Sequence, residues 1–188
     1  MTPKEILLHD VRQAMSSAEC LVSAEGVDKA LDAMAVAISR RIADRDPLIY
    51  VVMNGGLVLA GQILTRLQFP LEVSYLHATR YGHDTTGKLL DWRVRPTHDL
   101  RGRTVLVLDD VLDEGYTLLA VMEYLRNEGA SEVLSAVLVD KRHDHKAQTG
   151  MRPDFFGIEA PDRFLFGCGM DYKGYWRNAP GIYAIKGS

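Results

Sequence analysis

Cysteine is scarce in this sequence: Cys20 and Cys168 are the only two among 188 residues. They lie far apart and match neither a disulfide framework nor a metal-binding spacing, which favours a reducing compartment and therefore a cytoplasmic location. An excess of positive charge is also absent, because 22 Lys and Arg oppose 25 Asp and Glu for a net charge of -3. We therefore expect no general attraction to nucleic acid or to an anionic membrane, and any bound anion needs a local site.

Long uninterrupted apolar runs are lacking as well. Residues 47–65 carry no charged side chain and approach the ~20 residues that span a bilayer. However, Asn54, Gly55 and Gly56 stand in the middle of this segment, and adjacent glycines break a helix where lipid cannot satisfy the freed backbone. The N-terminus leads into no apolar signal region. We therefore expect neither a membrane span nor a secretory signal.

What the sequence does contain is the composition of an ordinary folded protein, with 47% apolar and 25% charged residues. Apolar residues at helical spacing predict helices that start at Thr2 and at Ser23, and others over residues 57–67 and 118–125. Continuous apolar runs predict buried strands at residues 48–53, 71–76, 104–108 and 133–139. This alternation predicts an α/β fold with a doubly wound, mainly parallel sheet and flanking helices, whose ligands bind at the carboxyl ends of the strands.

Two segments break this rhythm. Residues 82–99 mix glycine, threonine, histidine and charged residues without periodicity, and they predict an irregular, mobile excursion. After Gly150, short apolar pieces at residues 155–156, 164–166 and 183–185 predict a small C-terminal β-rich hood, or flap. The length suits one domain over residues 1–188. We expect a core of about residues 23–150, and a hood of residues 151–188 joined by the N-terminal helix.

The residues that follow the predicted strand 104–108 are the strongest candidate site. Asp109 and Asp110 offer acceptors for ribose hydroxyls or Mg²⁺, and the loop from Asp113 to Thr117 contains a glycine and opens a helix. A helix N-terminus presents free N–H groups and a positive dipole end, which suit a phosphate. The plain alternative is that the aspartates end a strand and Thr117 caps a helix. Three aspartates within five positions favour a site that could hold a sugar phosphate.

Two other motifs are less convincing. Residues 82–88 match the first part of a phosphate-binding P-loop, but Leu89 occupies the position that needs Ser or Thr, and no apolar strand leads into the motif. His143 and His145 could form a metal-binding pair. Because three cationic side chains lie around them in the sequence, a solvated loop is the favoured interpretation.

The segment from Asp109 to Thr117 resembles the phosphoribosyl-diphosphate signature of type I phosphoribosyltransferases, in which two acidic residues precede a D-x-G-x-T loop. Other segments resemble the hypoxanthine-guanine branch of that family. In chain order they are Asn54-Gly55-Gly56, residues 76–82, Lys141-Arg142, residues 153–157, residues 161–167, Asp171-Tyr172 and Arg177. The resemblance spans Tyr50 to Tyr183 and rests on the order of the motifs more than on any one of them.

The resemblance implies roles for the residues around the sugar phosphate. Asp109 and Asp110 would bind the ribose hydroxyls and the associated Mg²⁺, and Asp171 would hold a second Mg²⁺. Asp113 would be the catalytic residue that manages the proton at purine N7. The 5′-phosphate would be bound by Asp113, Glu114, Gly115, Tyr116 and Thr117.

The resemblance also implies roles at the leaving group, the base and a lid. The diphosphate would be bound by Asn54, Gly55 and Arg177, and the peptide of this Asn-Gly loop is often cis in the family. The purine would be bound by Lys141, Phe164, Leu165 and Asp171. Arg80 and Tyr81 would begin a mobile loop that closes over the reaction.

Ordinary structural explanations exist for four of these residues. They are a solvated strand exit for Lys141, core packing for Phe164, a turn acceptor for Asp171 and a surface cation for Arg177. The sequence also departs from the family pattern at four positions. Glu114 and Tyr116 replace a hydroxyl and a cation, Asn54 stands where lysine is common, and Arg80 stands where serine is common.

Together these residues and the resemblance imply a purine salvage transferase. It would convert hypoxanthine, guanine or both, with 5-phosphoribosyl 1-diphosphate, to IMP or GMP plus diphosphate, with Mg²⁺ as cofactor. We expect a homodimer or a homotetramer that binds neither nucleic acid nor membrane. Two alternatives are a phosphoribosyltransferase for another base such as xanthine, and a non-catalytic regulator that senses phosphoribosyl diphosphate with the same fold.

Overall fold

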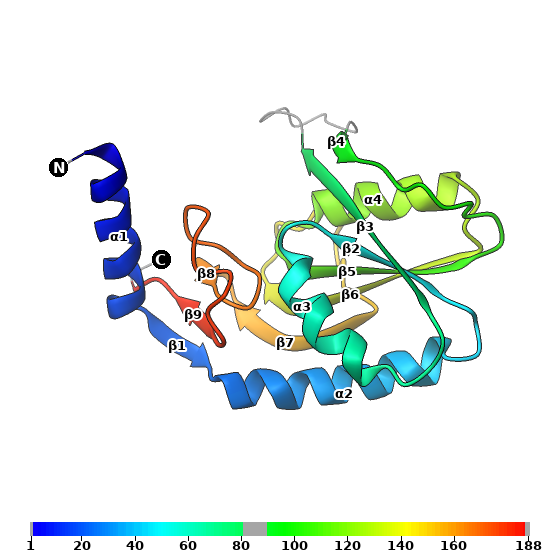
Figure 1. Ribbon diagram of the computed structural model, residues 1–188, viewed down its shortest axis with the longest axis horizontal. Helices are drawn as coiled ribbons and strands as arrows, with labels where there is room; N and C mark the ends of the chain where they lie inside the picture. Colours follow the sequence, from blue (N-terminus) through cyan, green and yellow to red (C-terminus); the bar gives the residue numbers. More distant parts are fainter. Residues whose placement is uncertain (1, 81–89, 187–188) are drawn as a thin grey trace.

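The computed structural model describes residues 2–80 and 90–186, which form two sheets with flanking helices (Figure 1). The larger sheet has the strand order β4 (Leu90–Val94), β3 (Glu72–Arg80), β2 (Leu48–Val52), β5 (Thr104–Leu112), β6 (Glu132–Arg142) and β7 (Phe155–Pro161). The smaller sheet has the order β1 (Glu19–Val22), β9 (Ile182–Ala184) and β8 (Leu165–Phe166). The helices are α1 (Pro3–Ser17), α2 (Ala24–Ile42), α3 (Gly56–Ile63), followed by a 3-10 turn (Leu64–Arg66), and α4 (Tyr116–Asn127).

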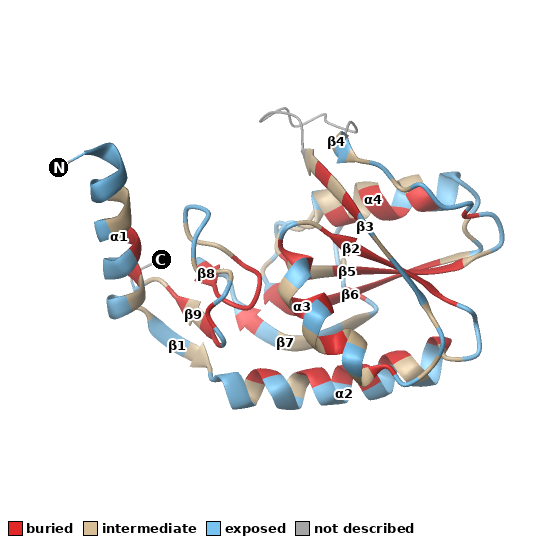
Figure 2. Cartoon of the chain, viewed as in Figure 1, coloured by how far each residue is buried: buried red, intermediate tan, exposed pale blue. Residues whose placement is uncertain are grey.

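The larger sheet is the middle layer of the molecule. In the sheet order β3-β2-β5-β6-β7, each strand is parallel to its neighbour. The edge strand β4 is antiparallel to β3. Successive side chains of a strand point to opposite faces. Ile49 and Val51 of β2 accordingly pack with α2 and α3, whereas Leu48, Tyr50 and Val52 pack with α4. Figure 2 shows the resulting buried residues along the strands and on the facing sides of the helices. The doubly wound, mainly parallel α/β sheet expected from the sequence is therefore confirmed.

The first two helices begin at the residues that the sequence predicted. The Thr2 hydroxyl accepts the N–H of Glu5 at 3.3 Å, and the Glu5 carboxylate accepts the N–H of Thr2 at 2.7 Å. Pro3 occupies the first turn, where its missing N–H is no loss. The Ser23 hydroxyl accepts the N–H of Gly26 at 3.2 Å and so caps α2. Side-chain capping therefore determines both helix starts.

Strands β5 and β7 of the larger sheet differ from the sequence prediction in extent and in the sheet they join. β5 does not end before the aspartates but continues to Leu112, which pairs with Asp140 of β6. Backbone pairing with a neighbouring strand does not depend on side-chain polarity, so the carboxylates lie within the strand and not after it. β7 pairs in parallel with β6, so the segment 155–161 belongs to the larger sheet and not to the hood. Its apolar residues Phe155 and Ile158 pack against the core beside α2.

The segment predicted as an irregular excursion contains a strand. β4 lies within it and pairs with β3, with Trp92 opposite Ala78 and Leu90 opposite Arg80. Trp92 also packs against Tyr124 of α4, with ring centroids 4.8 Å apart, which gives β4 an apolar anchor. Residues 81–89, and with them the P-loop-like motif, lie outside the described residues.

A small hood lies beside the carboxyl ends of the parallel strands, toward which their arrowheads point in Figure 1. It consists of β1, β8 and β9 together with α1. The short strand β1, which the sequence analysis did not predict, pairs in the antiparallel direction with β9. α1 is attached to the C-terminal segment because the Trp176 indole donates to the Val11 carbonyl at 2.7 Å, and Lys173 pairs with Asp10 at 2.9 Å.

Neither cysteine forms a disulfide: Cys20 is exposed and Cys168 is buried. No helix among the described residues is both long and apolar enough to cross a bilayer.

Candidate active site

The carboxyl end of β5 leads through a short loop into α4, and this turn lines a cleft. The backbone of Gly115 is left-handed (φ +85°), and a Cβ there would lie 2.8 Å from the sulfur of Met151, so glycine suits both the conformation and the space. The first N–H groups of α4 lie at the positive end of the helix dipole. The cleft has a volume of about 520 Å³ and is lined by Asp109, Asp110, Val111, the run from Asp113 to Leu118, His145 and Asp162.

Asp109 and Asp110 lie side by side in β5 and are largely shielded from solvent. Asp110 is 8% exposed, and its backbone N–H donates to Oδ1 of Asp109 at 2.9 Å. Burial raises the pKa of both carboxyl groups, and the neighbouring Asp110 charge raises the pKa of Asp109 further, whereas Arg177 acts in the opposite direction on both. Because two buried like charges repel, the pair favours a cation beside it.

The loop after β2 brings its backbone directly against Asp110. The peptide bond between Met53 and Asn54 is cis. A Cβ on Gly55 would overlap the Asp110 carboxylate, and a Cβ on Gly169 of the hood would overlap the carbonyl oxygen of Gly55. The β2 loop, strand β5 and the hood therefore meet at one place, and glycine is what allows the approach.

Arg177 joins the hood to this place. Its Nη1 lies 3.7 Å from Oδ2 of Asp110 and donates to the carbonyl of Gly169 at 2.5 Å, while its Nη2 pairs with Asp171. Asp171 also accepts the N–H of Gly174 at 2.6 Å, so it serves as a turn acceptor as well. Arg177 is therefore not a solvated surface cation, because it lies between the carboxylates of Asp110 and Asp171.

Lys141 is buried near the end of β6 and is not a solvated strand exit. Its side chain is 10% exposed, and Nζ donates to Oδ2 of Asp113 at 2.6 Å. Nζ also lies 3.9 Å from the carboxylate of Asp162, which follows β7. The predicted base-binding residue, Lys141, thus forms an ion pair with the predicted catalytic residue, Asp113.

His143 shares the same carboxylate, which the sequence analysis missed. Its Nε2 lies 3.1 Å from Oδ1 of Asp113, and its side chain is 4% exposed. The interpretation of residues 143–145 as a solvated loop is therefore wrong for His143, although His145 is exposed. One feature of the sequence could have identified His143 as a site residue: it follows Lys141 by two positions. In an extended chain, residues two positions apart point to the same side. The surrounding charges obscured this feature.

A second buried cation, Lys146, contacts the start of the loop from Asp113 to Thr117. The Lys146 Nζ donates to the carbonyls of Leu112 and Asp113 at 3.0 and 3.2 Å and to the Asp140 carboxylate at 2.9 Å. The Lys146 and Asp140 side chains are 6% and 0% exposed. This pair positions the backbone at the start of the loop from Asp113 to Thr117. Neither residue can be identified from the sequence, because an isolated Lys and an isolated Asp belong to no motif.

The remaining candidates differ in their exposure to solvent. Phe164 is 47% exposed, so it is not a core residue, and its ring meets the Tyr172 ring edge-on at a centroid distance of 5.7 Å. Leu165 is buried at 5% exposure in β8. Glu114 and Tyr116 are exposed and Thr117 is half-buried. Arg80 is the last residue of β3, and Tyr81 lies outside the described residues, so the mobile-loop expectation is untested.

Comparisons with known proteins agree with this architecture. Residues 19–173 match the family model of the phosphoribosyl transferase domain. A hypoxanthine-guanine phosphoribosyltransferase from Bacillus subtilis is 28% identical over 185 residues, which cover 96% of this chain and 97% of the relative. One from Aquifex aeolicus is 26% identical over 168 residues, with 88% and 93% covered.

Solved structures share the fold at lower sequence identity. A hypoxanthine phosphoribosyltransferase from Staphylococcus aureus superposes with a TM-score of 0.85 at 20% identity and covers 92% of this chain and 94% of its own. One from Trypanosoma cruzi, complexed with the product IMP, gives a TM-score of 0.81 at 19% identity, with 91% and 93% covered. Since the family model spans most of the sequence, the chain belongs to the phosphoribosyl transferase domain family.

Proposed function

We propose that this protein transfers the phosphoribosyl group of 5-phosphoribosyl 1-diphosphate to hypoxanthine, guanine or both, and releases IMP or GMP and diphosphate. The observation that carries the proposal is the convergence on β5 of the Asp109–Asp110 pair, the Gly55 backbone, Arg177 and the Lys141–Asp113 pair. The names of the similar proteins support the same reaction.

The sugar phosphate would occupy the cleft between β5 and α4. Backbone N–H groups from Glu114 to Thr117 would donate to the 5′-phosphate, because the start of a helix is the positive end of its dipole and its N–H groups suit an anion. Asp109 and Asp110 would accept the ribose hydroxyls. Glu114 and Tyr116 are exposed, so their side chains can lie outside the phosphate position. The loop therefore binds through its backbone, in keeping with its departures from the family pattern.

The diphosphate and the base would lie on either side of the ribose. Asn54, Gly55 and Arg177 would bind the diphosphate, since Arg177 and the Gly55 backbone both lie next to Asp110. Lys141 would donate to the purine 6-oxo group, Phe164 would stack on the ring, and Leu165 would offer its backbone. Phe164 follows Asp162 by two residues, and Asp162 lies 3.9 Å from Lys141, which supports a shared base pocket.

Asp109, Asp110 and Asp171 fit Mg²⁺, because carboxylate oxygens are the ligands it prefers and the buried aspartate pair favours a cation. When bound, Mg²⁺ would neutralise negative charge that grows on the departing diphosphate. The chain itself would orient the ribose through Asp109 and Asp110, and Arg177 would stabilise the leaving group. Asp113 would take the purine proton near N7.

The test is a panel of hypoxanthine, guanine, xanthine and adenine, each supplied with phosphoribosyl diphosphate and Mg²⁺, with nucleotide products identified by mass spectrometry. We expect IMP, GMP or both. XMP alone would favour the transferase for another base. Tight binding of phosphoribosyl diphosphate with no nucleotide from any base would favour the non-catalytic regulator and contradict the proposal.

Replacement of Lys141 by alanine should lower kcat/KM for hypoxanthine and guanine about ten- to a hundredfold, because a charge-assisted hydrogen bond is worth about 1.5–3 kcal/mol. Phosphoribosyl diphosphate binding should stay nearly intact. Steady-state kinetics and calorimetry measure the two effects. Arg142→Ala is the matched control, since Arg142 is the next residue and its side chain is 50% exposed. An unchanged kcat/KM for both bases in Lys141→Ala would remove Lys141 from the base pocket.

We also propose a cytoplasmic homodimer or homotetramer. The two free cysteines are compatible with a reducing compartment. The exposed apolar side chains Leu57, Val73 and Tyr75, on α3 and β3, offer area that association would bury.

A further inference from the structure

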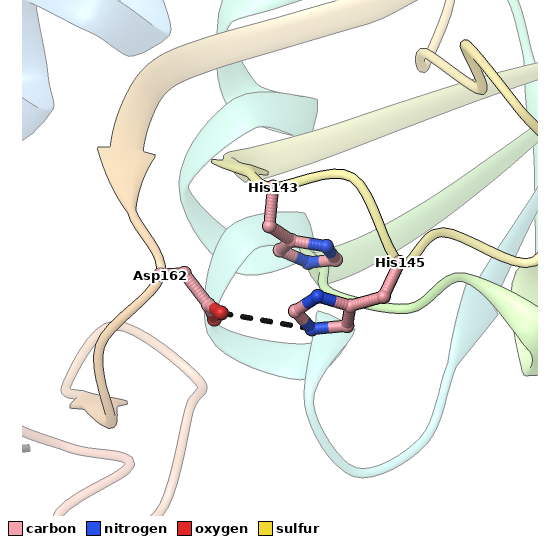
Figure 3. Close-up of side chains that lie close together, drawn as sticks. All are labelled: His143, His145 and Asp162. Atoms are coloured by element: carbon pink, nitrogen blue, oxygen red, sulfur yellow. Dashed lines mark ion pairs between the residues drawn. The ribbon is translucent and has the colours of Figure 1, made fainter.

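A cluster of three metal-ligand side chains lies at the edge of the cleft: His143, His145 and Asp162 (Figure 3). One ring nitrogen of each histidine and one carboxylate oxygen of Asp162 all lie within 4.8 Å of one another. The two imidazole rings stack with centroids 3.7 Å apart, and Nε2 of His145 lies 3.6 Å from Oδ2 of Asp162. The loop after β6 and the end of β7 thus bring their donors to one place.

His143 provides a second, independent observation. Its side chain is 4% exposed, and its Nδ1 is buried with no hydrogen-bond partner among the described residues. Its Nε2 lies 3.1 Å from the Asp113 carboxylate. A histidine that binds a metal usually donates its other ring N–H to a carboxylate or a carbonyl. His143 already has the carboxylate, and an ion would give the buried nitrogen a partner.

We propose that these three side chains bind a divalent transition-metal ion, for which Zn²⁺ is the best match. Zinc accepts imidazole nitrogen and carboxylate oxygen at about 2.0–2.2 Å, and two histidines, one carboxylate and a water form a common tetrahedral set. Ligands at those bond lengths lie about 3.3–3.5 Å apart, and the ion must lie near the plane of each imidazole ring, so one ring must turn out of the stack as the ligands close in. His145 and Asp162 can provide that movement, because their side chains are 59% and 43% exposed.

Charge and ligand type separate this site from the proposed Mg²⁺ site. Lys141 lies 3.9 Å from Asp162 and opposes a cation there, but its closer partner is Asp113 at 2.6 Å, and the two carboxylates outnumber it. Imidazole suits zinc, copper and nickel, whereas Mg²⁺ prefers oxygen ligands and retains several waters. We therefore expect Zn²⁺ at the histidines without competition from Mg²⁺.

The test uses metal-free protein and Zn²⁺, with a chromophoric zinc chelator as competitor to measure stoichiometry and Kd. We expect one ion per chain, and binding about tenfold weaker or more in His145→Ala and in Asp162→Asn. Asp144→Asn is the matched control, because Asp144 is exposed, stands between the two histidines and is outside the cluster. It should retain the parental Kd. Thermal unfolding checks that all three variants are folded.

An unchanged Zn²⁺ affinity in both cluster variants would overturn the proposal, and so would an equal loss in Asp144→Asn, because the ion would then bind elsewhere. Displacement of Zn²⁺ by millimolar Mg²⁺ would contradict the ligand argument. No substrate takes part in these measurements. Their outcome is therefore independent of the proposed transferase activity, and a protein that fails the base panel can still pass this test.

Discussion

Removal of divalent cations is expected to abolish phosphoribosyl transfer, and addition of Mg²⁺ is expected to restore it. Asp109 and Asp110 are neighbouring carboxyl groups whose pKa values are raised chiefly by burial, so the site is electrostatically unfavourable for two bare negative charges. Phosphoribosyl diphosphate would bring further negative charge to the same place. Arg177 is a single cation and already pairs with Asp171, so it cannot offset this charge alone.

Exhaustive EDTA treatment followed by gel filtration provides the metal-free protein, and product formation is then measured with and without added Mg²⁺. EDTA would also strip an ion from the cluster of His143, His145 and Asp162, so the restoring ion matters. Mg²⁺ alone should restore turnover, because the carboxylate site supplies the oxygen ligands that Mg²⁺ prefers. Circular dichroism of the metal-free protein controls for unfolding. Full activity in metal-free buffer would show that the carboxylates have no such role.

The central strands could be predicted from sequence because burial on both faces leaves an unbroken apolar run. β2 is the clearest case, since all five of its residues are buried. The loop from Asp113 to Thr117 could be predicted because the aspartates, the glycine and the helix start are adjacent in the chain. Both signals are local, and in both the side-chain pattern reports directly on the structure.

The remainder of the fold depends on contacts that are distant in sequence. β1 has only four residues and pairs with β9 at the opposite end of the chain, so no local periodicity marks it. The extension of β5 through polar residues depends on backbone pairing with β6. His143 became a site residue only through Asp113, thirty positions earlier in the chain. A local sequence pattern predicts burial and turns, but it does not predict which loops, distant in sequence, lie in contact in the folded protein.

Substitution of Asp113 by asparagine is expected to lower kcat about 10²- to 10⁴-fold, the usual contribution of general acid–base catalysis. The structure shows what the carboxylate does before any base arrives. It accepts from Lys141 at Oδ2 and lies within hydrogen-bond distance of His143 at Oδ1. An amide cannot take a proton, although its oxygen can still accept from Lys141. The variant therefore loses the proton acceptor and keeps the shape of the side chain.

Nucleotide binding should survive the same substitution. The 5′-phosphate would be held by the backbone N–H groups from Glu114 to Thr117, which Asp113→Asn leaves in place, and Lys146 still fixes the Leu112 and Asp113 carbonyls. Single-turnover kinetics are needed, because slow product release in the parent would hide part of the loss. Asp144→Asn makes the same chemical change on an exposed residue that follows His143 in the sequence, and it should retain parental rates. If Asp113→Asn keeps the parental single-turnover rate, or loses IMP affinity as severely as it loses rate, Asp113 supports the phosphate loop and does not handle the proton.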